Sequence, residues 1–301
     1  MIRVAIPALL LMAGLGAGVP VIAQDAGVVF RAGISLIRLD TEALDSAGLT
    51  LTDLKKEDFR VFDEGNAQPI VNFSFENEAL DLVLLFDTSG SMKGKLGQVV
   101  RAVELGFHEL KQGDRVCVMA FQRDAFEVAP FTTDLNAVNE TILLKVLSLH
   151  FAGSSNSERA ATGAAQRFRS EPKNLRRRAV LIVTDRAAAG SDSAVGPVRA
   201  LWQEDAVLSE LVIAHAPQTQ VLERGANVIA GMTGGATVVA GDPGPSFQQA
   251  LRLLRRRYTL WYAAPGGLSG SERHTEVRLS ADAAKRLPGS HIRARTGYLV
   301  P

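Results

Sequence analysis

The middle of the chain alternates short, uninterrupted apolar runs with segments whose apolar residues recur at helical spacing. The run Leu82–Phe86 is typical of a strand buried on both faces. The segment from Leu96 to Phe107 then repeats apolar residues every three or four positions, which predicts a helix. Further strand-like and helical segments follow at 114–121, 135–149, 160–168, 176–185, 207–216 and 247–254. Strands that alternate with helices form βαβ units, so we expect an α/β fold with a doubly wound, mostly parallel sheet and helices on both faces.

The two ends of the chain have the period-two alternation of strands instead of helical spacing. Short strand-like segments and turns fill residues 24–79, including a turn at Asp63–Gln68. Residues 258–301 return to the same pattern after the last predicted helix. Each segment alone is small for independent stability, so we expect the two to pair as a small β-rich subdomain beside the α/β domain at 80–257.

The pattern of the first 23 residues (1–23) indicates an export signal. Arg3 gives a positive start, an apolar stretch rich in Gly and Ala runs from Ile6 to Ala23, and small residues precede the bond to Gln24. Cleavage at that bond would leave an exported protein, periplasmic or extracellular, with no later apolar run long enough to span a membrane. The alternative is an uncleaved N-terminal anchor, which the prolines and glycines of the stretch disfavour.

The charge balance and the single cysteine exclude several classes of site. The chain has 33 Lys and Arg residues against 32 Asp and Glu, a net charge of +1, which gives no general attraction to nucleic acid or to anionic membranes. Cys117 is the only cysteine, so the chain forms no internal disulfide and no cysteine-based zinc site, and its apolar neighbours predict a buried structural thiol. We expect the basic clusters at 176–178 and 252–257 to form a solvated face or a strand entrance, with a rim that steers an acidic partner as the alternative.

Acidic and hydroxyl side chains follow two of the predicted buried strands. These residues are Asp87, Ser89, Ser91, Thr184 and Asp185. The carboxyl ends of parallel strands lie at one edge of an open sheet, where such folds bind ligands. Carboxylate and hydroxyl oxygens suit Mg²⁺, Mn²⁺ or Ca²⁺ better than zinc. We therefore expect a divalent cation site at this edge, with the alternative that Asp87 or Ser89 only caps the following helix.

An Asp-x-Ser-x-Ser motif after an apolar strand, with a later strand that ends in Thr-Asp, resembles the metal-ion-dependent adhesion site of the von Willebrand factor A (VWA) domain. Four flanking segments match the secreted bacterial VWFA-related family in order, namely LKKEDFRVFDEGNAQPI, TGGATVV, RRRYTLWYAAP and IRARTGYLVP. The resemblance implies a Rossmann-like VWA domain over 80–257. The metal ligands that it implies are Asp87, Ser89, Ser91, Asp185 and, in place of the family's threonine, Ser155, with Ser154 as the fallback and as part of a partner-binding rim.

The sequence departs from the family pattern next to Asp185. Family members commonly continue Asp-Gly-x-Asp, whereas this chain has Arg186 and lacks the second acid. A fixed positive charge at Arg186 weakens the negative field that attracts a metal ion. We expect Mg²⁺, Mn²⁺ or Ca²⁺ binding to be retained in weakened form, because every type of direct ligand is present. Loss of the metal with the fold kept is the alternative, and Arg186 is also a candidate for the partner-binding rim.

The resemblance implies an exported protein that binds a protein or peptide partner, whose Asp or Glu carboxylate completes the coordination of the metal. The alternative is a metal-free VWA module that scaffolds an assembly. No catalytic motif supports an enzyme: Gly90–Lys95 lacks the spacing of a phosphate-binding loop, and the sequence has neither a His-x-x-x-His pair nor a Gly-x-Ser-x-Gly turn. A metal-dependent hydrolase ranks last because no separate general base is evident.

Overall fold

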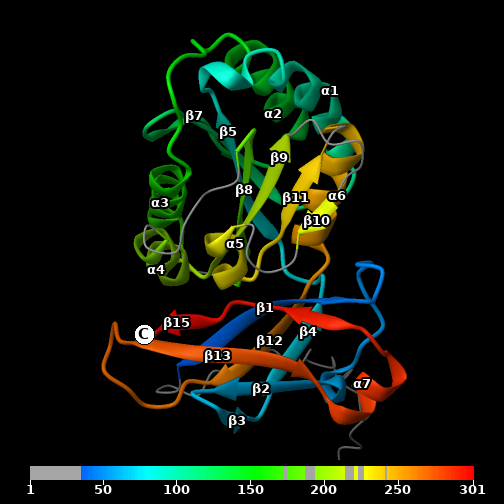
Figure 1. The fold of residues 1–301 in the computed structure, drawn as a ribbon. Helices are drawn as coiled ribbons and strands as arrows, with labels where there is room; N and C mark the ends of the chain where they lie inside the picture. Colours follow the sequence, from blue (N-terminus) through cyan, green and yellow to red (C-terminus); the bar gives the residue numbers. More distant parts are fainter. Residues whose placement is uncertain (1–34, 173–174, 187–193, 214–219, 223–226, 241–242) are drawn as a thin grey trace, which may run out of the picture. The chain divides into compact units, whose positions relative to one another are not determined.

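A seven-stranded sheet forms the centre of the α/β domain, with the strand order β10-β11-β9-β8-β5-β6-β7 (Figure 1). Its inner strands run parallel, and the edge strands β7 and β10 pair antiparallel with their neighbours. The strands are β5 (Leu80–Asp87), β6 (Arg115–Phe121), β7 (Ala125–Thr132), β8 (Arg177–Thr184), β9 (Ala206–Ile213), β10 (Gln220–Leu222) and β11 (Thr237–Ala240). β5 and β8 are buried along their whole length, as their apolar runs predict, and β9 is equally buried although Ser209 and Glu210 interrupt its apolar residues.

This arrangement comes from a computed structural model. It describes residues 35–172, 175–186, 194–213, 220–222, 227–240 and 243–301. The predicted signal at 1–23 and its cleavage point lie outside these residues. Ser35–Pro301 forms one compact unit. No helix in the described part of the chain is long and apolar enough to cross a membrane.

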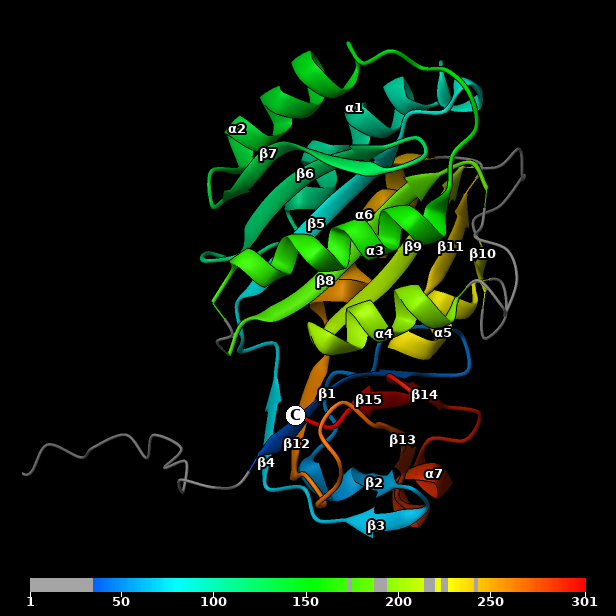
Figure 2. The same cartoon turned by 90° about the vertical axis from the view of Figure 1, so that its left-hand side faces the viewer.

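Two sets of helices cover the two faces of the sheet (Figure 2). α1, α2 and α6 pack on one face around a core that includes Val103 and Phe247, and α3, α4 and α5 pack on the other around Phe121 and Phe168. The helices are α1 (Leu96–Phe107), α2 (Leu135–Thr141), α3 (Ser157–Arg167), α4 (Val195–Gln203), α5 (Val228–Thr233) and α6 (Pro243–Arg255). The prediction of a doubly wound, mostly parallel sheet with helices on both faces is confirmed.

The segment predicted as one helix over Leu135–Leu149 consists of two parts. α2 ends at Thr141, and a single π-helical turn, η3 (Ile142–Val146), continues the chain. Ile142 and Val146 are both buried, so the apolar spacing identified the inward face correctly. The wider turn changes the backbone hydrogen bonding locally, which apolar spacing alone does not indicate.

Two four-stranded antiparallel sheets form the β-rich part of the chain, in the orders β14-β1-β12-β4 and β15-β13-β2-β3. In each sheet, strands from the start of the chain pair with strands from its end, and one buried core holds residues of both sheets, such as Leu39, Phe59 and Leu260. The elements are β1 (Leu36–Leu44), η1 (Lys56–Asp58), β2 (Phe59–Asp63), β3 (Asn66–Gln68), β4 (Asn72–Phe75), β12 (Tyr258–Ala263), β13 (Glu272–Leu279), α7 (Ala281–Arg286), β14 (His291–Arg293) and β15 (Gly297–Leu299).

The basic clusters lie at the entrance of β8 and the end of α6, where several of their arginines form buried ion pairs. Arg178 pairs with Glu204 at 2.8 Å, and Arg255 pairs with Asp114 at 3.0 Å. Arg177 donates to carbonyl oxygens at the end of α6, and burial lowers its pKa to about 10. The expectations of a solvated face or a steering rim are therefore wrong for these three arginines, because acids distant in the sequence fold against them.

Cys117 lies on β6 with no exposed surface, as its apolar surroundings predict. Burial raises the pKa of its thiol to about 12. We expect the native protein not to react with a thiol reagent such as DTNB at mildly alkaline pH, because the reactive thiolate is scarce and the sulfur inaccessible. Thiols counted before and after unfolding in guanidinium chloride check this expectation. Rapid reaction of the native protein would contradict the buried position.

Candidate metal centre

Three loops at the carboxyl edge of the central sheet carry the predicted site residues. β5 leads through the short turn η2 (Gly90–Met92) into α1, β8 ends beside β5, and the loop after η3 leads into α3. β5 and β8 are adjacent parallel strands in which Phe86 pairs with Val183, so the loops that follow them start side by side. The five predicted ligands on these loops are Asp87, Ser89, Ser91, Ser155 and Asp185.

Asp87 forms the floor of the site. Its side chain is fully buried, and Oδ1 accepts a hydrogen bond from the backbone N–H of Ser89 at 2.8 Å. Oδ2 accepts from the hydroxyls of Ser155 at 2.8 Å and Thr184 at 2.7 Å. A buried carboxylate requires such donors, because an unpaired charge away from water is costly. These bonds connect all three loops through one side chain.

Ser89, Ser91 and Asp185 extend the site from its floor toward solvent. Ser89 Oγ lies 3.3 Å from Ser91 Oγ, and Ser91 Oγ donates to Asp185 Oδ1 at 3.1 Å. Ser89 is buried and Ser91 is exposed, while Asp185 is partly exposed as a residue but only 5% exposed in its side chain. The structure thus brings all five predicted ligands together. Ser154 and Arg186, the predicted rim residues, are both exposed at the edges of these loops.

Backbone contacts fix the loop that carries Ser155. The N–H of Ala152 donates to the carbonyl oxygen of Thr88 at 3.3 Å, and the N–H of Gly90 donates to that of Gly153 at 3.2 Å. Gly153 has a φ of +64°, in the left-handed region that glycine adopts without strain. The tight pairing of the two loops explains how Ser155 reaches a carboxylate 68 positions earlier in the chain.

A lysine that the sequence reasoning missed supplies the closest positive charge. Lys95 Nζ lies 2.7 Å from Asp185 Oδ2. Burial raises the pKa of Asp185, but hydrogen bonds from Lys95 and Ser91 and the charge of Arg186 outweigh it and hold the pKa below its ordinary value. Lys95 is the N-cap residue of α1, where the helix dipole disfavours a cation, so its position was a signal for a nearby acid.

The side chain of Arg186 does not take the place of a metal ion. It is exposed and forms no ion pair with any described residue. Its backbone N–H donates to the Thr184 hydroxyl at 3.3 Å. The fixed charge expected from Arg186 therefore acts on Asp185 only at a distance, and Lys95 makes the direct contact.

The donor set of three hydroxyls and two carboxylates fits a hard divalent cation. Mg²⁺ and Mn²⁺ take oxygen ligands of both kinds. No group of three or more His, Cys, Asp or Glu side chains suited to a metal occurs among the described residues. A cation at this centre would therefore depend on Ser89, Ser91 and Ser155 as well as on the two acids.

Residues 82–188 match the family model of the von Willebrand factor type A domain. This chain contains a VWA domain. The matched stretch includes all five residues of the candidate metal centre. No curated protein sequence matches the chain.

Solved structures of VWA-type proteins are also similar to this chain. An aerotolerance-related membrane protein from Bacteroides fragilis has 18% identity over 58% of this chain and 98% of its own, with a TM-score of 0.46. A von Willebrand factor type A protein from Catenulispora acidiphila has 12% identity over 91% and 76%, with a TM-score of 0.48. Proximal thread matrix protein 1 from the mussel byssus, with a zinc-occupied MIDAS motif, has 11% identity over 64% and 50%, with a TM-score of 0.45.

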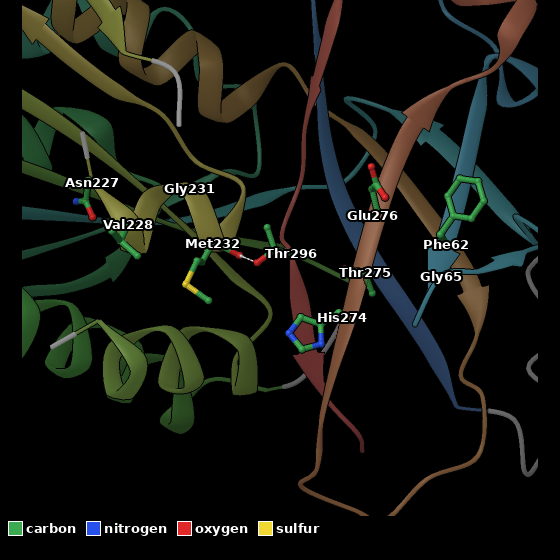
Figure 3. Close-up of a pocket in the computed structure, with 10 residues that line it drawn as sticks. All are labelled: Phe62, Gly65, Asn227, Val228, Gly231, Met232, His274, Thr275, Glu276 and Thr296. Atoms are coloured by element: carbon green, nitrogen blue, oxygen red, sulfur yellow. Dashed lines mark hydrogen bonds between the residues drawn. The ribbon is translucent and has the colours of Figure 1, made fainter. Parts of the chain in front are cut away.

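A separate cavity of about 540 Å³ lies between α5, which packs on the central sheet, and β13 of the β-rich part (Figure 3). Val228 and Met232 line it from α5, and His274 and Glu276 line it from β13. Thr296 closes one side by donating its hydroxyl to the carbonyl oxygen of Met232 at 3.4 Å. None of the five predicted ligands lines this cavity. Its walls come from segments far apart in the sequence, so no local sequence motif indicates the cavity.

Proposed function

We propose that this chain is an exported protein that binds a protein or peptide partner through a divalent cation held by its VWA domain. The observation that carries the proposal is the single hydrogen-bonded group formed by the five ligands at the carboxyl edge of the sheet. When bound, the cation, Mg²⁺ or Mn²⁺ with Ca²⁺ as the alternative, supplies an open coordination position that an Asp or Glu carboxylate of the partner fills. The proposal assigns no catalytic step to the chain.

The side chains of the site have different roles in this proposal. Asp87 is buried and keeps the three loops in register through Ser155, Thr184 and the backbone of Ser89. Ser91 is exposed, so a partner carboxylate can approach the same oxygens from solvent. Export of the protein rests on the apolar segment at 1–23, and its test is N-terminal sequencing of the protein recovered from the cell envelope or the medium.

A metal-free scaffolding role is the second candidate, and one observation favours it. The Lys95 ammonium already neutralises Asp185 at 2.7 Å, and a lysine so placed competes with a cation for the same carboxylate. The Lys95 side chain is 29% exposed and Asp185 5%, so the pair is only partly shielded from water. The strength of this competition decides between the two candidates.

Calorimetric titration of Mg²⁺ or Mn²⁺ into metal-free protein distinguishes metal-dependent binding from the metal-free scaffold. We expect the wild type to bind the cation and the Lys95→Gln variant to bind it about fivefold more tightly, since removal of a partly exposed ion pair is worth about 1 kcal/mol. Lys93→Gln, which removes an exposed lysine two positions away, serves as the matched control. Absence of heat and of a thermal shift in the wild type would rule out the metal-dependent proposal, and binding by Lys95→Gln alone would assign the closure of the site to Lys95.

Partner binding requires its own experiment. Immobilised wild-type protein is incubated with envelope extracts in MgCl₂ and again in EDTA, beside an Asp87→Ala variant. The proposal expects a protein that is retained only by the wild type in MgCl₂. Equal retention in EDTA and by Asp87→Ala would support the metal-free scaffold.

A further inference from the structure

An open apolar groove lies beside the candidate metal centre, between the start of α1 and the loop that follows η3. Its volume is about 340 Å³. Leu147, Leu149 and Phe151 line one wall, and Gly94 and Gly97 leave the opposite wall open. A Cβ atom built on either glycine would meet no other atom within 4 Å. The groove can therefore accept an apolar side chain from outside without displacing any part of the protein.

Both walls of the groove continue directly into the metal centre. Gly94 follows Ser91 by three residues, and Phe151 directly precedes Ala152, whose N–H bonds to the loop after Asp87. A ligand carboxylate at the metal centre and a neighbouring side chain in the groove would thus touch the same two loops. This continuity makes the groove and the metal centre one surface.

Exposed leucines lie close in sequence to the wall of the groove, and one of them, Leu147, lines it. Three of the ten large apolar side chains that are exposed in the described chain lie within five residues, at Leu143, Leu144 and Leu147. Leu144 is 71% exposed. Leu143 and Leu144 lie on the π-helical turn η3 and Leu147 directly follows it, and such turns are found often at functional sites. Leucines clustered in this way indicate a surface that another molecule covers.

The polar side chains of the groove favour an acidic occupant. Lys93 and His150 line it, and none of its lining residues is acidic. Lys145, on η3 between the exposed leucines, is exposed and adds a further positive charge. An acidic segment would complement these charges, and a cation at the metal centre would add to the attraction.

We propose that the groove binds an apolar side chain of the partner peptide, next to the Asp or Glu whose carboxylate reaches the metal centre. This inference rests on the proposed function and narrows the partner to an extended segment that carries an acidic residue with Leu, Ile or Phe close by in sequence. Leu147, Leu149 and Phe151 bury the apolar side chain, while Lys93 and His150 face the acidic residues.

A displayed library of random short peptides, selected on the immobilised protein in MgCl₂, tests the proposal. We expect enriched peptides to combine an acidic residue with a large apolar residue nearby. Gly97→Leu fills the groove with the variant's own side chain and should weaken binding of a synthetic enriched peptide about tenfold or more. Gly196→Leu is the matched control, since its Cβ also enters open space but on α4, which covers the other face of the sheet.

The possible results distinguish the groove proposal from the metal-binding proposal. Peptides that are lost in Gly97→Leu and also in EDTA support both proposals, whereas loss in Gly97→Leu with unchanged binding in EDTA supports the groove and overturns the metal. Peptides lost in EDTA but bound equally by Gly97→Leu overturn the groove and leave the metal centre standing. Enrichment of acidic peptides without apolar residues, or of no peptides at all, also overturns the groove.

Discussion

Replacing Asp63 by alanine is expected to lower the free energy of unfolding by about 3–5 kcal/mol, the range for breaking a buried charged network. Asp63 is fully buried at the end of β2. Its carboxylate accepts hydrogen bonds from the hydroxyls of Tyr262 at 2.7 Å and Tyr298 at 2.8 Å, and from Arg273 Nε at 2.7 Å. Alanine leaves two buried hydroxyls without an acceptor, at about 1–3 kcal/mol each. Arg273 is 21% exposed and can turn to water, so its loss costs less.

Urea denaturation of the wild type and of Asp63→Ala measures this loss. Arg60→Ala is the matched control, because Arg60 lies on the same strand with an exposed side chain, and its truncation should cost less than about 0.5 kcal/mol. Asp63→Asn keeps one acceptor oxygen and should fall between the wild type and Asp63→Ala. A loss below about 1 kcal/mol in Asp63→Ala would mean that the carboxylate is not a principal support of the β-rich part.

The Asp63 cluster connects three of the flanking segments of the sequence. Asp63 belongs to EDFRVFDEG, Tyr262 to YTLWYAAP and Tyr298 to RTGYLVP, so three distant segments meet at one carboxylate. Burial raises the pKa of Tyr298 to about 12 and raises that of Tyr262 as well, which keeps both hydroxyls protonated as donors. Three segments that lie far apart in the sequence therefore meet through hydrogen bonds to one carboxylate.

The central sheet could be predicted because its strands are buried on both faces. The sequences of β5 and β8 contain an uninterrupted run of apolar residues instead of alternating apolar and polar ones. Such a short apolar run is typical of a strand buried on both faces. β7 could not be predicted in the same way, since its burial shows no period of two and its pairing with β6 shifts register twice. α5 also escaped prediction because a helix of six residues contains too few turns to show a period.

The sequence predicts those parts of the candidate site whose positions follow from the order and direction of the strands. Asp87 ends β5 and Asp185 directly follows the adjacent parallel strand β8, so no side-chain conformation is needed to bring their loops together. The salt bridge from Lys95 could not be derived, because it depends on how a long side chain crosses between two loops. The buried pairing of Arg178 with Glu204 was hidden for a similar reason, as 26 residues separate the partners.

Replacing Asp87 by asparagine is expected to abolish stabilisation by Mg²⁺ while leaving the metal-free protein at least as stable as the wild type. Asparagine keeps an acceptor for the N–H of Ser89, and the hydroxyls of Ser155 and Thr184 can rotate to accept from its NH₂ group, since a hydroxyl both donates and accepts. The substitution therefore preserves the local hydrogen bonds and removes only a buried charge. Asp87→Ala loses the bonds as well and should be less stable than the wild type by about 1–3 kcal/mol.

Thermal and urea unfolding of the three proteins, with and without Mg²⁺, separates the two roles of Asp87. At a Mg²⁺ concentration one hundred times the dissociation constant, the wild type should gain about 2.7 kcal/mol, and both variants should gain nothing. Equal stabilisation of Asp87→Asn by Mg²⁺ would place the cation elsewhere in the protein. If Asp87→Asn instead lost as much stability as Asp87→Ala without metal, the charge of Asp87 would itself be structural. If Asp87→Asn is more stable than the wild type without Mg²⁺, the Asp87 carboxylate lowers the stability of the metal-free protein. A cation that binds this carboxylate would explain why the chain carries it, so the direction of the stability change in Asp87→Asn bears directly on the proposed function.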